Sequence, residues 1–272
     1  MASMRTLSVK DLQFSYDGNI VFEGVNLEFG KGEMIGLIGP NGAGKSTLLR
    51  LLMGLMAPGQ GEVHLNGGCI SRIKRRELAQ YLTLVPQDSQ VGYAFSAEEL
   101  VAMGRNPWLG RFQPLGRHDV DIIQSAMEKM DVARFAKRSV NQLSGGERQR
   151  VFIARAIAQE TPIIMLDEAT ANLDICHQLE ILSLAKKLAE GGRTVIAAIH
   201  DLTMASRFCD RLLLLADKGL RADGRANEVL TEGNLRRYFK LHAEVHAQSG
   251  RPGLNIAAIS PVSSSESNNY ND

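Results

Sequence analysis

The chain has 272 residues, of which 31 are Lys or Arg and 30 are Asp or Glu, so its formal net charge is +1. This length corresponds to one large domain or to a core with a subdomain, and such a chain can fold without disulfides or structural metals. The near-neutral charge argues against a nucleic-acid-binding protein that relies on a strong basic field.

Other protein classes are excluded by the pattern of residues. None of the apolar runs approaches the roughly 20 residues that a membrane-spanning helix needs. The N-terminal sequence MASMRT lacks the apolar core of a secretion signal. Cys69, Cys176 and Cys209 are far apart in sequence, and no pair has the C-x-x-C spacing of zinc or redox sites. We therefore expect a soluble cytosolic protein with reduced thiols.

The N-terminal part predicts strands followed by a helix. Short alternating runs in residues 7–29, with a turn at 17–19, predict a pair of antiparallel strands. Met34–Ile38 predicts a short strand, which a glycine-rich turn follows. Leucines at helical spacing then predict a helix over residues 46–56. The expected buried face of this helix consists of Leu48, Leu49, Leu51, Leu52 and Leu55.

The middle of the chain is predicted to be helical. A strand is expected at residues 61–65 and the end of a short helix at 77–82. From about Asp88 to Ala158 the apolar spacing is helical and the β-branched runs disappear. We interpret this stretch as an inserted helical subdomain.

The β pattern returns after Pro162. Strands are expected at residues 163–166, 195–199 and 211–215, and a helix at residues 178–189. Strands that alternate with helices predict an α/β fold with a mostly parallel sheet. From about Ser260 the chain is polar and of low complexity, which predicts disorder.

A glycine-rich loop joins the strand at 34–38 to the helix after it and matches G-x-x-x-x-G-K-[ST]. The matching residues are Gly39, Pro40, Asn41, Gly42, Ala43, Gly44, Lys45, Ser46 and Thr47. Glycines let backbone N–H groups turn inward and bind phosphate oxygens, and the following helix adds its positive dipole end. Lys45 would bind the β- and γ-phosphates of a nucleotide, and Ser46 would be a Mg²⁺ ligand. A plain glycine-rich turn is the alternative, but the flanking strand and helix favour the phosphate site.

Two carboxylates, Asp167 and Glu168, end the apolar run at 163–166, and Asp167 lies 122 residues after Lys45. In a parallel sheet, ligand-binding groups lie at the carboxyl ends of the strands. Asp167 would hold Mg²⁺ through its water shell, and Glu168 could activate a water molecule as a general base. An acidic strand end at the protein surface is the alternative interpretation.

A third motif begins a helix at the sequence LSGGE, residues 143–147. It forms a capping box, in which Ser144 caps the helix and Glu147 reaches back to it. The exposed N–H groups of Gly145 and Gly146 would offer an anion site. By itself this motif would be an ordinary helix cap.

With these motifs in this order, residues 7–245 closely resemble the nucleotide-binding subunit of an ATP-binding cassette (ABC) transporter. The resemblance implies an α/β P-loop NTPase core with a mostly parallel sheet, an N-terminal antiparallel β subdomain and an inserted α-helical subdomain. The implied domains are the core at 1–88 and 159–245, the helical signature subdomain at 89–158, and a C-terminal extension at 246–272.

The resemblance also assigns roles to residues that mean little in isolation. Tyr16 is similar to the aromatic residue that stacks on adenine, and Gln87 to the Q-loop glutamine that completes the Mg²⁺ shell. Asp174 ends an A-N-L-D segment that resembles the D-loop, and His200 is similar to the switch histidine at the γ-phosphate. Ala169 departs from the proline that many members carry there, but we expect no loss of activity.

The implied activity is ATP hydrolysis with ATP and Mg²⁺ bound. The implied catalytic residues are Glu168, His200, Gln87 and Lys45. One chain lacks a group opposite the γ-phosphate, and in the family a second copy supplies it. Ser144, Gly145, Gly146 and Asp174 would therefore complete the partner's site, which implies a homodimer around two ATP molecules.

Residues 95–112 resemble the stretch after the Q-loop in ATPases of iron-siderophore, haem and cobalamin importers. This implies contact with integral membrane permease subunits around Gln87 and residues 105–112, with Arg105, Trp108 and Arg111 as candidate contacts. The protein would be peripheral, at the cytoplasmic face of the inner (cell) membrane, and linked indirectly to an extracytoplasmic substrate-binding protein. A loop packed only within the helical subdomain is the alternative.

Other ABC proteins fit the sequence less well. Chromosome and DNA-repair members carry a long coiled coil between the phosphate loop and the signature, and this chain has no sustained heptads. Translation ATPases usually carry two cassettes, and fused exporters carry membrane spans. We expect no nucleic-acid partner. The ATPase of an exporter or of an importer with another cargo remains open, as does a soluble non-transport ATPase, and the sequence does not name the cargo.

Overall fold

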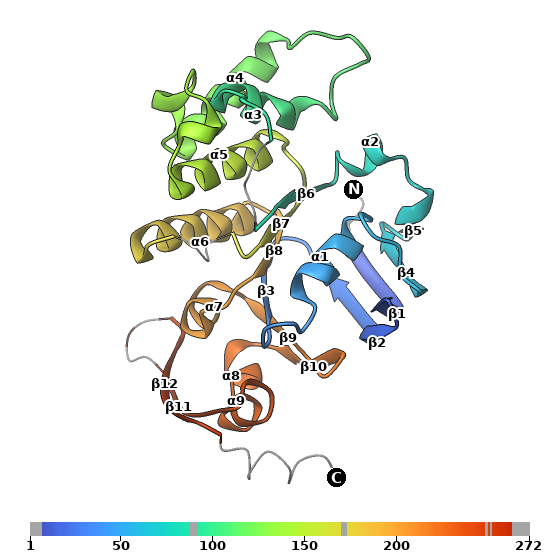
Figure 1. Cartoon of the computed structure of the whole chain (residues 1–272), viewed down its shortest axis with the longest axis vertical. Helices are drawn as coiled ribbons and strands as arrows, with labels where there is room; N and C mark the ends of the chain where they lie inside the picture. Colours follow the sequence, from blue (N-terminus) through green and yellow to red (C-terminus); the bar gives the residue numbers. More distant parts are fainter. Residues whose placement is uncertain (1–6, 88–91, 170–172, 248–249, 251, 263–272) are drawn as a thin grey trace.

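The computed structural model describes residues 7–87, 92–169, 173–247, 250 and 252–262. Its centre is a six-stranded sheet with the order β10-β9-β3-β8-β7-β6 (Figure 1). These strands are β3 (Met34–Ile38), β6 (Leu82–Val85), β7 (Ile163–Asp167), β8 (Thr194–Ala198), β9 (Arg211–Ala216) and β10 (Gly219–Gly224). Neighbouring strands are parallel except β9 and β10. β3, β7 and β8 are buried along their whole length, which explains their nearly continuous apolar sequences.

A four-stranded antiparallel sheet lies beside the central sheet, in the order β2-β1-β4-β5. Its strands are β1 (Leu7–Tyr16), β2 (Asn19–Phe29), β4 (Gln60–Leu65) and β5 (Gly68–Cys69), and helix α1 (Lys45–Leu52) packs against it. Leu213 and Leu215 of β9 face the core shared with α1 and this sheet. Leu212 and Leu214 face the opposite core, as the two-residue period of a strand requires.

Helices cover the second face of the central sheet, and several of them form the separate upper lobe in Figure 1. The lobe contains α3 (Ala97–Ala102), η2 (Met103–Arg105), α4 (Arg117–Lys129), η3 (Ala133–Phe135), η4 (Val140–Gln142) and α5 (Gly145–Ala158). The other helices are η1 (Ile70–Arg72), α2 (Arg75–Leu78), α6 (Ile175–Glu190), α7 (Leu202–Phe208), α8 (Ala226–Val229) and α9 (Glu232–Phe239). In the part of the chain that the structure describes, no helix has the length and apolar character needed to cross a bilayer.

The first helix is shorter than the leucine spacing predicts. It ends at Leu52, and Gly54 takes up a left-handed conformation with φ +63°. The N–H of Leu55 then donates to the carbonyl of Arg50 at 2.9 Å, which closes the helix end. The prediction that Leu55 is buried is wrong, since the turn leaves it 57% exposed.

The described C-terminal segment forms two paired strands. β11 (Leu241–Ala247) and β12 (Leu254–Pro261) form an antiparallel hairpin, in which Ser260 pairs with His242. The strand ends at Pro261, close to the start of the segment expected to be disordered, and residues 263–272 of that segment lie outside the described residues. β10 and α7 were not predicted.

Candidate active site

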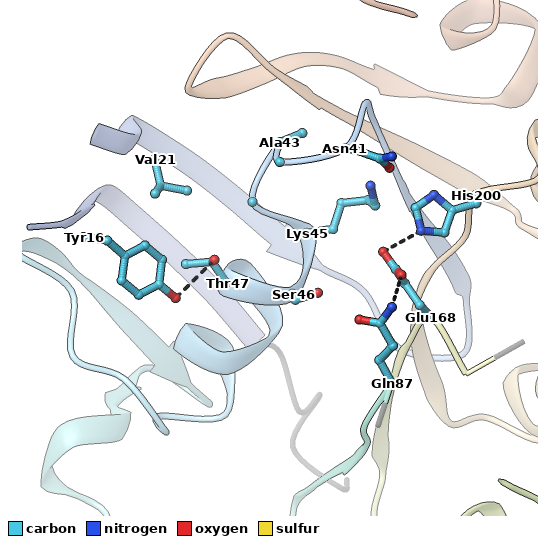
Figure 2. Close-up of a pocket in the computed structure, with 12 residues that line it drawn as sticks. Tyr16, Val21, Asn41, Ala43, Lys45, Ser46, Thr47, Gln87, Glu168 and His200 are labelled. Atoms are coloured by element: carbon cyan, nitrogen blue, oxygen red, sulfur yellow. Dashed lines mark hydrogen bonds and ion pairs between the residues drawn. The ribbon is translucent and has the colours of Figure 1, made fainter. Parts of the chain in front are cut away.

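A pocket of about 640 Å³ lies where the carboxyl ends of β3, β6, β7 and β8 meet the four-stranded antiparallel sheet (Figure 2). It is lined by Tyr16, Val21, Asn41, Gly42, Ala43, Gly44, Lys45, Ser46, Thr47, Gln87, Glu168 and His200. Segments far apart in sequence thus converge at the edge of the sheet where α/β proteins bind their ligands. Of these residues, Val21 of β2 was not predicted. The hairpin brings it beside Tyr16, but no sequence motif marks it.

The glycines of the phosphate loop are required by its geometry. Gly42 and Gly44 have φ of +79° and +92°, in the left-handed region that other residues rarely adopt. A Cβ atom at Gly44 would lie 2.7 Å from Cζ of Phe22. A Cβ at Gly39 would lie 2.1 Å from the carbonyl oxygen of Leu215. The tight turn of the loop therefore needs glycine at Gly39 and Gly44.

Lys45 begins α1, and its side chain is folded back over the loop. Its Nζ donates to the carbonyl oxygens of Gly39 at 3.0 Å and of Pro40 at 3.3 Å. Burial lowers the pKa of Lys45, and the carboxylates of Glu168 and Asp167 partly oppose that shift. A phosphate bound in the loop would stabilise the ammonium form in the same way.

Ser46 and Asp167 form the contact expected of a metal site. Ser46 Oγ donates to Asp167 Oδ1 at 2.7 Å, across 121 residues of sequence. Burial is the main cause that raises the pKa of Asp167. A hydroxyl and a carboxylate side by side, with the Gln87 side chain in the same pocket, supply the hard oxygen donors that Mg²⁺ prefers. These residues therefore fit the predicted metal.

Glu168 stands in the centre of a three-residue polar cluster (Figure 2). His200 Nε2 lies 2.6 Å from its Oε1, and Gln87 Nε2 donates to its Oε2 at 2.7 Å. The backbone of Glu168 has φ +48°, which costs about 1–3 kcal/mol for a residue other than glycine. The conformation turns the carboxylate into the pocket, where both partners hold it. The structure thus brings these three residues, each singled out from the sequence, into one cluster.

Tyr16 lies at the far end of the pocket from Glu168. Its hydroxyl is 3.4 Å from Thr47 Oγ1, and its ring packs edge-on against Phe14 at a centroid distance of 4.8 Å. The ring is 40% exposed. An exposed aromatic face fixed at this position can stack on a planar base.

The signature residues do not line this pocket. Ser144 caps α5, and its hydroxyl accepts from the N–H of Glu147 at 3.3 Å, so the predicted capping box is present. A Cβ atom at Gly145 would meet no atom of the described residues within 4 Å. Asp174 caps α6 and accepts from the N–H of His177 at 3.0 Å. Ala171 and Asn172 of the predicted D-loop lie outside the described residues.

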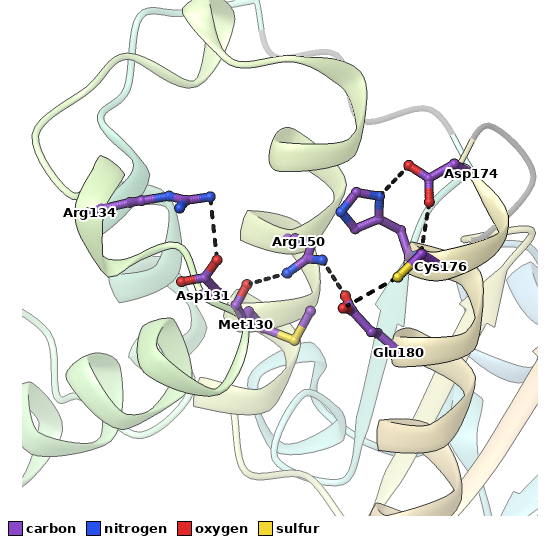
Figure 3. A network of polar contacts seen from close by, with 8 residues as sticks. Met130, Asp131, Arg134, Arg150, Asp174, Cys176 and Glu180 are labelled. Atoms are coloured by element: carbon purple, nitrogen blue, oxygen red, sulfur yellow. Dashed lines mark hydrogen bonds and ion pairs between the residues drawn. The ribbon is translucent and has the colours of Figure 1, made fainter.

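A polar network joins the two helices that begin at these caps (Figure 3). Arg150 of α5 forms an ion pair with Glu180 of α6 and donates to the carbonyl of Met130 at 3.3 Å. The carboxylate of Glu180 also accepts a long contact from Cys176 Sγ at 4.0 Å. The network holds the starts of α5 and α6 in a fixed relation to each other.

The expectation that Arg105 contacts a membrane partner is wrong. Its side chain is buried and binds Asp119, Glu160 and the carbonyl of Ala158. Trp108, by contrast, is 40% exposed, although its indole N–H donates to the carbonyl of Gln159 at 2.8 Å.

Comparison with known proteins gives consistent matches. The model of the ABC transporter family matches residues 22–171. The cobalamin import ATP-binding protein BtuD of Halobacterium salinarum is 38% identical over 258 residues, which cover 94% of this chain and 64% of that protein. This chain therefore spans less than two thirds of the length of that relative. The iron(3+)-hydroxamate import ATP-binding protein FhuC of Bacillus subtilis is 39% identical over 243 residues, covering 89% of this chain and 90% of that protein.

Solved structures show the same similarity. An inward-facing structure of a proposed metal-chelate type ABC transporter matches with a TM-score of 0.81 and 31% identity, covering 94% of this chain and 98% of that chain. The dimeric structure of MJ0796, a bacterial ABC transporter cassette, matches with a TM-score of 0.72 and 30% identity, covering 81% of this chain and 98% of that chain.

Proposed function

Since this chain belongs to the ABC transporter family, we propose that it is the ATP-hydrolysing subunit of a metal-chelate importer and drives a separate membrane permease. The observation that carries the proposal is the Glu168 carboxylate, held between Gln87 and His200 at the mouth of a phosphate loop. A binding module without hydrolysis has no need for a general base in this position.

Nucleotide binding follows from the residues of the pocket. The Tyr16 ring stacks on adenine, and the loop around Lys45 binds the phosphates through backbone N–H groups and the ammonium. Ser46, Gln87 and Asp167 would hold Mg²⁺, which neutralises phosphate charge when bound. The hydrogen bond between Ser46 and Asp167 keeps these two oxygen ligands together beforehand.

Hydrolysis requires a water molecule in line with the γ-phosphate. Glu168 orients this water and accepts its proton, because its carboxylate faces the loop. His200 contacts the γ-phosphate, and its present contact with Glu168 keeps both groups at that position. Gln87 donates to Glu168 from its amide nitrogen, so its amide oxygen would be available to the metal shell when Mg²⁺ is bound.

The second copy of the chain supplies what the pocket lacks. Ser144, Gly145 and Gly146 lie outside the pocket of their own chain, and a Cβ atom at Gly145 would meet no described atom within 4 Å. In a homodimer they would close the partner's site, with Asp174 nearby, around two ATP molecules. The match to a dimeric cassette supports this arrangement.

The dimer is tested with the Glu168→Gln variant, which keeps the side-chain shape and removes the base. In Mg-ATP this variant should elute as a dimer on size exclusion and hydrolyse no ATP, whereas the unmodified protein hydrolyses ATP. Addition of Lys45→Ala is the matched control and should return the variant to a monomer. A Glu168→Gln protein that stays monomeric in Mg-ATP would contradict the dimer.

The surface proposed to contact the permease is the loop that carries Trp108, Arg111 and Phe112. Phe112 is 92% exposed, so its whole ring is available to a partner. The loop is anchored to α2 and to the turn after it. Arg76 Nε of α2 donates to the carbonyl of Pro107 at 3.1 Å, and Gln80 Nε2 of the turn donates to the same carbonyl at 2.8 Å. A fixed apolar projection of this kind suits a docking contact at the cytoplasmic face of the cell membrane.

The cargo proposal rests on the relatives, which are named for import of cobalamin and of iron(3+)-hydroxamate. An extracytoplasmic binding protein would deliver such a chelate to the permease. The test is a tagged pull-down from detergent-solubilised membranes, followed by mass spectrometry, with Phe112→Ser as the matched control. Recovery of a multi-span protein that Phe112→Ser loses would support the importer. Recovery of ribosomes, nucleic acid or an exporter would overturn it.

A further inference from the structure

The switch histidine stands between a fixed strand and a short helix. Ile199, just before it, follows β8, and its N–H donates to the carbonyl of Leu37 on β3 at 3.1 Å, which ties it to the central sheet. Asp201, just after it, caps α7 by accepting from the N–H of Met204 at 2.9 Å. The position of the His200 imidazole therefore depends on where α7 lies.

The far side of α7 is joined to the C-terminal hairpin (Figure 1). Ser206 Oγ donates to the carbonyl of Thr203 on its own helix at 2.8 Å. The same oxygen accepts from the backbone N–H of Leu254 on β12 at 2.8 Å. Ser206 is 7% exposed and Leu254 is 9% exposed, so water does not compete for this bond.

Gly253 makes the close approach of the hairpin possible. It has φ +100°, and a Cβ atom there would lie 3.0 Å from Cα of Arg207. Only a glycine allows the two backbones to come this near without a shift. Leu254 then packs in the same core as Ala205 and Phe208 of α7.

We propose that the β11–β12 hairpin is a positioning element of the ATPase site, and that Ser206 and Gly253 are positioning residues that hold His200 against Glu168 through α7. Hydrogen bonds and packing fix α7 at both ends, so the backbone that carries His200 is held in place. The inference rests on the proposed ATP hydrolysis and adds the C-terminal extension to the catalytic machinery.

The test uses full-length protein with a change on either side of the contact. Ser206→Ala removes the acceptor on α7, and Gly253→Ala pushes the hairpin away. Each should lower kcat for ATP about tenfold, since a small misplacement of a catalytic group is enough, and leave KM for ATP unchanged. Gly67→Ala is the matched control, because Gly67 also has positive φ (+81°) but lies outside the hairpin, and its Cβ would meet no described atom within 4 Å. This control should hydrolyse ATP at the unmodified rate.

A double-mutant measurement separates positioning from general stability. In a His200→Ala background, Ser206→Ala should lower the residual rate no further, because the group it positions is gone. An equal loss in both backgrounds, or a rise in KM with kcat unchanged, would overturn the inference. If Ser206→Ala does not fold, Gly253→Ala carries the same comparison. Unchanged kcat in both variants would overturn the inference and leave the ATPase standing, whereas an unmodified protein without ATPase activity would overturn both.

Discussion

Replacement of Arg105 by alanine should destabilise the fold rather than weaken a surface contact. Its Nε donates to Asp119 at 2.9 Å, and its Nη1 donates to the carbonyl of Ala158 at 2.8 Å and to Glu160 at 3.0 Å. The guanidinium also lies 5.7 Å from the centre of the Trp108 ring. Arg105 itself is 4% exposed. One side chain thus joins η2, α4 and the end of α5.

The magnitude follows from what the truncation leaves behind. A broken buried ion pair costs about 3–5 kcal/mol, because the remaining charge stays without its partner. The side chains of Asp119 and Glu160 are 14% and 43% exposed, so water recovers part of this loss. We therefore expect a loss of about 3 kcal/mol in the free energy of unfolding. In a chain of this size, that loss lowers Tm by roughly 6–12 °C.

Urea unfolding followed by circular dichroism measures this loss, with Arg111→Ala as the matched control. Arg111 is exposed and rests over the Phe112 ring at 5.4 Å, so its removal should change stability by less than about 0.5 kcal/mol. If Arg105→Ala and Arg111→Ala unfolded at the same urea concentration, the buried network would not have the strength assigned to it.

Two further predictions concern the pocket. Gly44→Ala should weaken nucleotide binding more than about tenfold, because the strained φ and the clash with β2 distort the loop; a titration with fluorescent ATP checks this. Gly18→Ala, with φ +84° and open space around it among the described residues, should bind normally. The rate of ATP hydrolysis should fall, on acidification, at a pH above the ordinary aspartate range, because burial raises the pKa of Asp167 and its proton competes with Mg²⁺. A higher Mg²⁺ concentration should shift this fall in rate to lower pH. A fall whose pH does not change with Mg²⁺ concentration would contradict the role assigned to Asp167.

The phosphate site could be predicted because its geometry is local. Gly39 to Ser46 needs only a strand before it and a helix after it, and both follow from apolar spacing. The contact between Ser46 and Asp167 was predictable as well, since parallel strands bring their carboxyl ends to one edge. Val21 was missed because its role depends on hairpin register rather than on its own chemistry.

The predictions for Arg105 and Leu55 are wrong because the burial of each residue depends on other parts of the chain. Arg105 occurs in a polar stretch, and its burial depends on Asp119 and Glu160, which are 14 and 55 residues away. Leu55 has helical spacing, but the turn at Gly54 ends the helix first.

Trp108 is the only tryptophan of the chain, and its loop contacts both the end of α5 and helix α2. Its indole bonds to the end of α5, whereas its loop is held by α2 outside the lobe, so a rotation of the lobe relative to α2 would change the surroundings of the ring. Trp108 can therefore serve as an intrinsic fluorescent probe. Intrinsic fluorescence at this position can follow lobe movement in real time during an ATP cycle, without a dye and without an engineered residue.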